Sequence, residues 1–347
     1  MPEKFGNVCV YTGGLHLIRK SGVGRAIEHQ IAALKSQGIR VNEAPLRACS
    51  IVHINSVFPR SVITALYARR HGVKVIWYGH STMEDFRNSF TGSNLLAPLF
   101  KKWITFCYNL ADVIITPTPY SKSILNTYPI RKPILVCSNG VDTDFWKGDE
   151  SAGLQEREAF LKKYRLPTDR KLVMSVGHFM ERKGILEFIA LAKRHPEITF
   201  LWFGHTDAVL TPAKIKSAMK AAPDNLHFAG FVNSEELRRA YLSCDLFLFL
   251  THEETEGIVV LEAMACRIPV IVRDIPVYEG WLTDQENVLK FRDESQLEGM
   301  LSTALTTDQS AMTKKARSTA EERSLTVVGK KLTEIYRLLK YSFKEVR

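Results

Sequence analysis

Short apolar runs alternate with segments of helical periodicity along almost the whole chain, and this alternation limits the fold more than any other feature. The runs are rich in Val and Ile, which is typical of strands buried on both faces of a parallel sheet. They cover 7–11, 51–54, 73–77, 113–115 and 134–136 in the first half, and 171–177, 199–204, 226–230, 246–250 and 270–272 in the second. The pattern predicts an α/β protein whose helices connect parallel strands.

A polar segment divides this alternation into two blocks. Residues 142–169 show no strong strand pattern. The 347 residues are enough for two domains with separate cores. We therefore predict Rossmann-like domains at 1–145 and 170–325, a linker with a short helix at 146–169, and a final helix at about 326–347 that returns to the first domain. A ligand is expected between the domains, beyond the carboxyl ends of the strands.

Positive charge is concentrated in the first half. The chain has 47 Lys and Arg against 37 Asp and Glu, and residues 1–145 hold 17 against 8. This excess of positive charge in the first half suggests an anionic partner, either nucleic acid or an acidic membrane surface. No apolar run reaches the roughly 18 residues that span a bilayer, and residues 1–5 lack the layout of a signal peptide. We expect a cytoplasmic protein.

The cysteines give no sign of a cross-linked or metal-binding protein. Six of them lie scattered at positions 9, 49, 107, 137, 244 and 266, without a C-x-x-C pair. Several fall in or beside apolar strand-like runs. This distribution favours buried thiols in a reducing compartment.

The stretch 253–274 carries the strongest indication of chemistry. The apolar run 246–250 leads into an acidic turn, then Gly257, then a helical segment that contains Glu262. Free amides at a helix start can hold a diphosphate, and the carboxylates of Glu254 and Glu262 can accept hydrogen bonds from sugar hydroxyls. The spacing of the two glutamates alone fits an ordinary amphipathic helix with a solvated acidic turn equally well, so both interpretations stay open at this point.

Two glycine-containing loops each follow a predicted strand and precede a predicted helix. The amides of Gly22, Val23 and Gly24 could face a phosphate. Without a third glycine, this first loop fits a plain strand-to-helix turn just as well. Arg182 and Lys183, in the second loop, could neutralise a diphosphate leaving group, and a solvated loop is the alternative.

Two further features of the first half also have two interpretations. His80 ends a predicted strand among polar neighbours and could belong to a reaction site, although a lone histidine at a strand end is more often structural. Residues 94–108 combine large apolar side chains with Lys101, Lys102 and Trp103. They fit an interfacial helix lying in a membrane surface or an amphipathic helix packed on the sheet. The basic excess of this half favours the membrane.

Together these segments resemble a known family. The string from Glu254 to Glu262 is similar to the donor-site motif E-x7-E of the retaining glycosyltransferases of family four, and the loops at 20–25, 78–82 and 177–184 match other motifs of that family. The resemblance covers most of the chain. It implies a GT-B fold, in which two Rossmann-like domains face each other across a cleft, and a retaining transfer of a sugar.

The resemblance also implies roles for residues at the donor. Glu262 would hold the ribose hydroxyls of a UDP-hexose, and Glu254 the hexose hydroxyls. The amides of Gly257 and Ile258, with the two cations of the second loop, would stabilise the departing UDP. The donor would be UDP-glucose or UDP-galactose, and no cofactor is implied. The D-x-D spacing at 142–144 suggests a metal site, but it matches the inter-domain turn of a family that generally needs no divalent metal.

Other residues would complete the site. The loop after 226–230 would receive the uracil through backbone groups, and Phe231 or Val232 would flank the base. His80 would contact the reacting sugar or the acceptor, and the first glycine loop would face the diphosphate and the sugar. The family usually has an Arg directly after the first glycine of the second loop. Here His178 stands in that place, so Arg182 would supply the missing charge.

A narrower resemblance involves 20–27, 78–82, 253–262 and 273–282, which look like segments of bacterial diglycosyldiacylglycerol synthases. These enzymes add a second hexose to monoglucosyldiacylglycerol, and the product is a membrane glycolipid and the anchor of lipoteichoic acid. The resemblance implies a glycolipid acceptor, an anionic membrane surface as partner, and a peripheral location on the inner face of the cell membrane. A same-fold hexosyltransferase for a polyprenyl-linked or soluble glycan is the alternative. A nucleic-acid-binding protein is a remote one, because no binding motif is visible.

Overall fold

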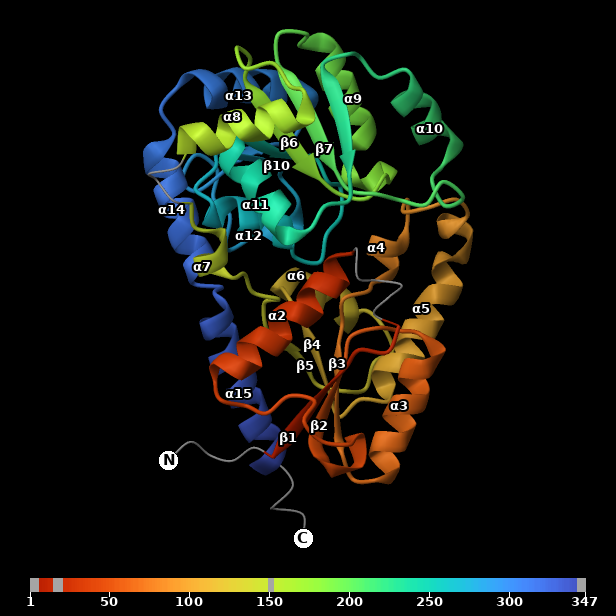
Figure 1. Cartoon of the computed structure of the whole chain (residues 1–347). Helices are drawn as coiled ribbons and strands as arrows, with labels where there is room; N and C mark the ends of the chain where they lie inside the picture. The colour runs from red at the N-terminus through yellow and green to blue at the C-terminus, as the bar shows by residue number, and fades with distance from the viewer. Residues whose placement is uncertain (1–5, 15–20, 149–152, 342–347) are drawn as a thin grey trace. The chain divides into compact units, whose positions relative to one another are not determined.

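The computed structural model describes residues 6–14, 21–148 and 153–341 of the chain. They form two compact α/β units, each with its own parallel sheet (Figure 1). Of the described residues, those within Met1–Phe86, Leu95–Asp142 and Arg323–Arg347 form the first unit, and those within Arg87–Asn94 and Thr143–Glu322 form the second.

The sheet of the first unit contains five parallel strands that lie side by side in chain order. They are β1 (Asn7–Tyr11), β2 (Cys49–Ile54), β3 (Lys74–Tyr78), β4 (Val113–Thr116) and β5 (Ile134–Val136). On the edge of β1 away from β2, Val8 forms a parallel bridge with Val41, and its N–H donates to the carbonyl of Arg40 (3.0 Å). The chain therefore first moves to one side of β1 and then returns to the other. Such a reversal of strand order opens a crevice at the carboxyl end of the strand.

Helices cover both faces of this sheet (Figure 1). They are α2 (Gly22–Ser36), η1 (Leu46–Ala48), α3 (Pro59–Arg70), α4 (Met83–Phe86), α5 (Ser93–Asn109), α6 (Pro119–Asn126) and α15 (Leu325–Tyr341). On one face, Ile27 and Leu34 of α2 pack with Leu332 of α15. On the other, Ala65 of α3 packs with Ile104 of α5.

The sheet of the second unit has six strands, ordered β11-β10-β9-β6-β7-β8, and every neighbouring pair is parallel. The strands are β6 (Leu172–Val176), β7 (Thr199–Phe203), β8 (Leu226–Gly230), β9 (Leu246–Phe249), β10 (Val270–Arg273) and β11 (Leu289–Phe291). The chain runs outward from β6 to β8 and then returns to the other side of β6 with β9. The reversal therefore places β6 and β9 side by side at the centre of the sheet.

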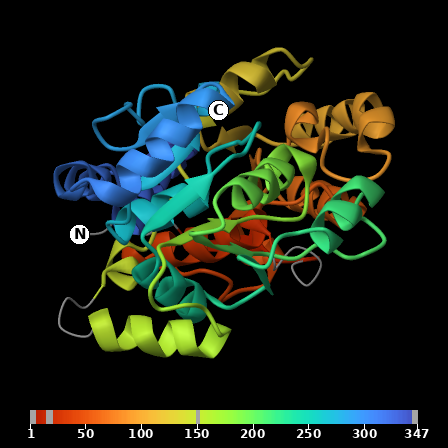
Figure 2. The same ribbon diagram turned by 90° about the horizontal axis from the view of Figure 1, so that it is seen from above.

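The helices of the second unit are α7 (Thr143–Trp146), α8 (Gly153–Tyr164), η2 (Glu181–Lys183), α9 (Ile185–Arg194), α10 (Ala213–Lys220), α11 (Ser234–Ser243), α12 (Ile258–Ala265), η3 (Pro276–Tyr278), α13 (Glu294–Thr306) and α14 (Ser310–Glu321). Helix α8 lies beside α11 (Figure 2). The main core contains Phe188, Phe200 and Trp202, which meet in edge-to-face contacts.

The structure departs from the sequence-based division in several places. Residues 143–169 belong to the second unit rather than forming a free linker, because Trp146, Phe160 and Leu161 are buried there. The short segment Arg87–Asn94 also groups with the second unit. Strand β11 is absent from the prediction, because Lys290 interrupts the apolar pair Leu289 and Phe291 and leaves no continuous apolar run.

The last helix belongs to the first unit. The chain leaves α14 at Glu321 and re-enters the first unit at Arg323, where Val141 and Ser324 form a parallel bridge. Helix α15 then packs tightly on α2 at Gly329. None of the six cysteines, all of which lie in the described ranges, is in a disulfide.

Gly329→Ala should destabilise the protein although Ala is the better helix former. A Cβ at this position would lie 2.3 Å from the carbonyl oxygen of Ala33, so α15 would have to move away from α2 at a cost of about 1–3 kcal/mol. The matched control is Gly299→Ala in α13, where a Cβ meets no atom within 4 Å. This substitution should stabilise the protein by about 1 kcal/mol, because Ala is the better helix former. Urea denaturation followed by circular dichroism measures both changes, and effects of the same sign would contradict the proposed packing.

Candidate functional site

Two loops of the second unit meet where the strand order reverses. One loop, 177–184, follows β6, and the other, 250–257, follows β9. Hydrogen bonds join them: the N–H of His252 donates to the carbonyl of Arg182 (2.7 Å), and the Arg182 guanidinium donates to the carbonyl of Glu253 (3.1 Å). Open α/β sheets bind ligands at such a reversal, beyond the carboxyl ends of the strands. This edge of the sheet is therefore the candidate site.

Gly184 makes the close approach of the loops possible. Its backbone is left-handed, with φ of +76°, which favours glycine. A Cβ at this position would also lie 2.5 Å from the carbonyl oxygen of Leu250. Any other residue would force the two loops apart.

An ion pair also links the loops. The ammonium group of Lys183 contacts the carboxylate of Glu254, and the hydroxyl of Thr251 donates to the same carboxylate (3.2 Å). The side chains of Lys183 and Glu254 are only 13% and 10% exposed. In such a desolvated setting, each charge needs a compensating partner. The structure thus brings two predicted site residues into direct contact.

The second loop ends in helix α12, which begins after Gly257. This glycine has a φ of +92°. Its carbonyl accepts the N–H of Val260 (2.9 Å), and the N–H groups of Ile258 and Val259 precede this bond, at the end of a helix where amides lack intrahelical partners. The structure decides against the amphipathic alternative, because α12 is buried nearly all round and Glu262 is only 1% exposed. A carboxylate held in such a place is costly, and buried ionisable groups are enriched at functional sites.

Arg182 has a different setting from Lys183. Its Nε donates to the hydroxyl of Ser89 (2.8 Å), and its backbone N–H donates to the carbonyl of Asn88 (3.4 Å). Together with its bond to Glu253, these contacts tie the segment Arg87–Asn94 to the loops. Arg182 therefore contributes to the architecture of the loops, while Lys183 carries the cation that faces a site carboxylate.

The remaining predicted residues of the second unit lie along the same edge of the sheet. Phe231 and Val232 follow β8, which is separated from β6 by β7, and Phe231 is exposed. His178 follows β6, and its Nδ1 donates to the carbonyl of His205 (2.6 Å), which follows β7. Burial lowers the pKa of His178. This favours the neutral form of the His178 ring.

Tyr278 is a residue of this site that the sequence did not single out. It is fully buried in η3, and its hydroxyl lies 3.5 Å from the position that a Cβ on Gly257 would occupy. Burial and the nearby charge of Glu254 raise the pKa of Tyr278 well above its usual value. The hydroxyl forms no hydrogen bond to the residues that the structure describes. Only tertiary packing reveals it, because no local pattern indicates that the hydroxyl of Tyr278 lies beside Gly257.

In the first unit, the first glycine loop starts α2 and His80 follows β3. Lys20 lies outside the described residues, while Gly22 begins the helix and Ser21 caps it by accepting the N–H of Gly24 (3.5 Å). A Cβ on Gly22 would meet no described atom within 4 Å. His80 is buried against Tyr78, whose ring stacks on it at 4.7 Å, and burial lowers its pKa to about 3.

Helix α5 places the three predicted membrane residues in different surroundings. Lys102 is exposed. Lys101 lies over the ring of Tyr128 (4.2 Å), and the indole N–H of Trp103 donates to the carbonyl of Val57 (2.7 Å). Trp103 therefore packs inward on the unit and is not part of the outer face.

The turn at 139–145 has a structural role. The ring nitrogen Nδ1 of His29 donates to the carbonyl of Gly140 (2.8 Å), whose φ is +77°. Beside it, the chain returns as α15, with Leu325 and Val328 close to Gly140. Within the described ranges, no group of three or more His, Cys, Asp or Glu side chains could hold a metal ion.

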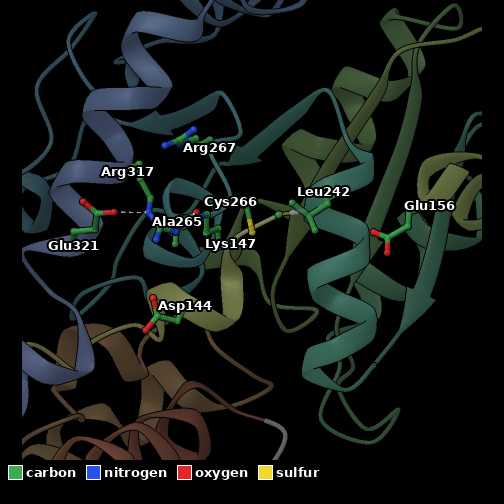
Figure 3. Close-up of a pocket in the computed structure, with 10 residues that line it drawn as sticks. Asp144, Lys147, Glu156, Leu242, Ala265, Cys266, Arg267, Arg317 and Glu321 are labelled. Atoms are coloured by element: carbon green, nitrogen blue, oxygen red, sulfur yellow. Dashed lines mark hydrogen bonds and ion pairs between the residues drawn. The ribbon is translucent and has the colours of Figure 1, made fainter. Parts of the chain in front are cut away.

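A pocket of about 480 Å³ lies at the other end of α12 (Figure 3). None of the predicted site residues lines it. Arg317, at its wall, donates to the carbonyls of Thr143 (2.9 Å) and Ala265 (2.6 Å) and to the carboxylate of Glu321 (2.8 Å). The guanidinium of Arg317 thus caps the carboxyl end of α12 and links it to α7. Because the candidate site lies at the amino end of α12, this pocket is separate from it.

Solved structures with the same architecture define the class. Sucrose-phosphate synthase from Thermosynechococcus elongatus matches with a TM-score of 0.78 at 16% identity, over 97% of this chain and 99% of that one. HepE of Anabaena in complex with UDP-glucose matches with a TM-score of 0.72 at 16% identity, over 95% and 99%. The predicted GT-B fold, with two Rossmann-like α/β units, is confirmed, and this is a fold of glycosyltransferases.

Sequence relatives define the family. The model for glycosyl transferases group 1 matches residues 156–323, and the model for glycosyltransferase family 4 matches residues 38–145. The chain is 36% identical over 330 residues to the processive diacylglycerol alpha-glucosyltransferase of Acholeplasma laidlawii, covering 95% of this chain and 97% of that protein. It is 27% identical to the alpha-galactosylglucosyldiacylglycerol synthase of Streptococcus pneumoniae, over 76% and 70%. The chain belongs to glycosyltransferase family 4.

Tyr278→Phe should leave the free energy of unfolding unchanged or raise it by about 1 kcal/mol, because it removes a buried hydroxyl with no partner among the described residues. The matched control is Tyr241→Phe, which is equally buried in the same unit but donates to the carbonyl of Val259 (3.0 Å). That change should cost about 1 kcal/mol. Denaturant titration of both variants measures the free energy of unfolding. Equal losses of stability in the two variants would contradict the absence of a hydrogen bond from the Tyr278 hydroxyl to the described residues.

Proposed function

We propose that the protein is a retaining α-glycosyltransferase that moves glucose or galactose from a UDP-hexose to monoglucosyldiacylglycerol. The product would be a dihexosyl diacylglycerol, a membrane glycolipid and an anchor for lipoteichoic acid. The similarity to a processive diacylglycerol alpha-glucosyltransferase over almost the full length of both chains carries this proposal. The chemistry of the candidate site supports it.

The second unit would bind the donor. The diphosphate would lie at the start of α12, where the amides of Gly257 and Ile258 and the helix dipole favour negative charge. Lys183 would exchange its contact with Glu254 for the phosphate oxygens and stabilise UDP as it departs. The freed carboxylate of Glu254 would accept hydrogen bonds from the hexose, and Glu262 from the ribose. No cofactor or metal is needed in this scheme.

The first unit would handle the acceptor. His80 would contact the reacting sugar or the acceptor, and the amides of residues 22–24 would face the donor phosphate and sugar. Attack by the acceptor hydroxyl on the same face from which UDP leaves would retain the α configuration at the anomeric carbon.

The outer surface of α3 and α5 fits an anionic membrane. The two helices pack on the same face of the sheet, and Arg69 of α3 donates to the carbonyl of Leu110, just after α5 (3.0 Å). Both sequences lack acidic residues. Their exposed side chains combine apolar and basic groups: Arg60, Ile63, Leu66, Tyr67, Arg69, Arg70, Leu95, Leu96, Leu99, Lys102 and Phe106. Exposed apolar side chains combined with basic ones are typical of surfaces that lie in the headgroup region.

This surface supports a peripheral position on the inner face of the cell membrane. Among the described helices, none combines the length and the apolar character that a bilayer-spanning segment needs. The exposed apolar side chains of this surface also favour a lipid acceptor over a soluble or polyprenyl-linked glycan. They favour a membrane over nucleic acid as the partner, because nucleic-acid sites are rich in charge rather than in exposed leucine.

The direct test supplies purified protein with monoglucosyldiacylglycerol and with UDP-glucose or UDP-galactose in separate reactions. Diacylglycerol, a polyprenyl-linked sugar and a soluble glycan serve as competing acceptors. A dihexosyl lipid with an α linkage, identified by mass spectrometry and NMR, is the expected product. Transfer to the soluble glycan alone would overturn the proposal.

Glu254→Gln and Glu262→Gln should each lower kcat/KM by about 100-fold, since each loses charge-assisted hydrogen bonds to the donor that are worth about 1.5–3 kcal/mol apiece. Both substitutions keep the shape of the side chain. Glu235→Gln, at an exposed position of α11, is the matched control and should leave the rate unchanged. Steady-state kinetics with circular dichroism of each variant make the comparison, and near-normal rates in both site variants would refute the donor assignment.

Replacing both Leu95 and Leu99 by Ser should weaken binding to phosphatidylglycerol vesicles by about tenfold for each leucine, because apolar area is lost from the membrane contact. Vesicle sedimentation measures the effect. The control replaces Val209 and Leu210 by Ser, since these residues are also exposed but belong to the second unit. Unchanged binding in the first variant, or equal losses in both, would contradict the membrane surface.

A further inference from the structure

A chain of buried amides leads to His80 in the first unit. Gln30 of α2 and Asn55, which directly follows β2, exchange two hydrogen bonds of 2.9 Å: Gln30 Nε2 donates to Asn55 Oδ1, and Asn55 Nδ2 donates to Gln30 Oε1. The same Oδ1 lies 2.9 Å from Nε2 of His80. The three residues are 0%, 3% and 6% exposed, so water competes little for these bonds.

This arrangement decides which ring nitrogen of His80 carries the proton. The amide group of Asn55 is turned so that its NH2 donates to Gln30 and its oxygen faces His80. An amide oxygen can only accept a hydrogen bond. Nε2 of His80 must therefore donate, which leaves the lone pair on Nδ1. No hydrogen bond joins Nδ1 to the residues that the structure describes.

The surroundings keep the ring neutral. Burial lowers the pKa of His80 to about 3, with no contribution from a charged side chain in the described ranges. Near the carboxyl ends of β2 and β3, the titratable groups are Tyr78, which stacks on the ring and bonds to the carbonyl of Cys137 (2.5 Å), and His53, which bonds to Tyr336 (2.7 Å), while Cys49 and Lys74 lie at the opposite ends of these strands. Neither group offers His80 a negative charge.

We propose that Gln30 and Asn55 are positioning residues that hold His80 as a neutral ring with Nδ1 as a hydrogen-bond acceptor for a sugar hydroxyl. This inference rests on the proposed function, in which His80 contacts the reacting sugar or the acceptor. Such a weak base orients the hydroxyl and does not remove its proton. The role of His80 is thus positioning of the sugar by an acceptor nitrogen rather than general base catalysis.

The amide pair also connects two parts of the proposed site. Gln30 lies about two turns along the helix that begins at Gly22. Its bonds to Asn55 fix the rotation of α2 relative to β2, and the bond from Asn55 to His80 extends this link to the end of β3. The first glycine loop and His80 are therefore held in register by one pair of side-chain amides.

The tautomer can be measured without substrate. Protein labelled with 15N-histidine gives imidazole correlation spectra in which protonated and unprotonated ring nitrogens differ, and His80→Asn identifies the His80 signals by their loss. We expect a protonated Nε2 and an unprotonated Nδ1 that stay unchanged from about pH 8 to about pH 5, below the ordinary pKa of histidine. A proton on Nδ1, or a ring that titrates in this range, would overturn the proposal.

Asn55→Asp tests the positioning role by kinetics. The carboxylate keeps an oxygen toward Nε2, removes the donor to Gln30, and raises the pKa of His80 because a negative charge favours the imidazolium. Below this raised pKa, Nδ1 is protonated and can no longer accept. We expect kcat/KM to fall about tenfold per pH unit on the acidic side and to recover at alkaline pH. A loss by the same factor at every pH would indicate a merely structural role and refute the inference.

Asn42→Asp is the matched control in the same unit. The amide of Asn42 accepts from the N–H of Val10 (2.8 Å) and donates to its carbonyl (3.1 Å), so the substitution removes one donor in the same way. Its kcat/KM should show no new acidic limb. The kinetics of His80→Asn test the proposed function separately: a normal rate would overturn the contact between His80 and the sugar. The spectra test the positioning of His80 by Gln30 and Asn55 directly.

Discussion

The candidate site depends on one topological constraint, the reversal of strand order in a parallel sheet. In the second unit the chain travels from β6 to β8 and returns to the other side of β6, so that the loops after β6 and β9 become neighbours. All strands are parallel, and their carboxyl ends therefore lie at one edge. Lys183 and Glu254 are distant in sequence, and only this reversal brings them together.

The contact between these two residues explains how two largely buried charges are tolerated at the site. A cation and a carboxylate that are both largely buried must compensate each other, because either charge alone would be costly. In the proposed function, the phosphate oxygens and hydroxyls of the donor would give each of them a replacement partner. Glu262 sits deeper, in a helix that is buried nearly all round. Packing thus holds the polar groups of the site in place, and such preorganised groups reduce the cost of ordering on binding.

Sequence patterns predicted the strands of both sheets well, because Val- and Ile-rich runs have few other stable placements than a buried parallel sheet. They were less informative where burial comes from a few residues. Trp146, Phe160 and Leu161 draw the expected linker into the second unit, and Trp103 turns inward although its neighbours suggested a membrane face. Composition cannot distinguish the two sides of a helix when both contain large apolar residues.

The sequence by itself determined the two α/β units, the position of the glycine loops and the family, since strand periodicity and short motifs are local properties of the chain. Only the tertiary structure decided the state of the functional groups. The pairing of Lys183 with Glu254, the buried hydroxyl of Tyr278 and the orientation of His80 by Gln30 and Asn55 all join segments from different elements. The physical reason is that hydrogen bonds and desolvation depend on what surrounds a side chain in space, and no local pattern records those neighbours.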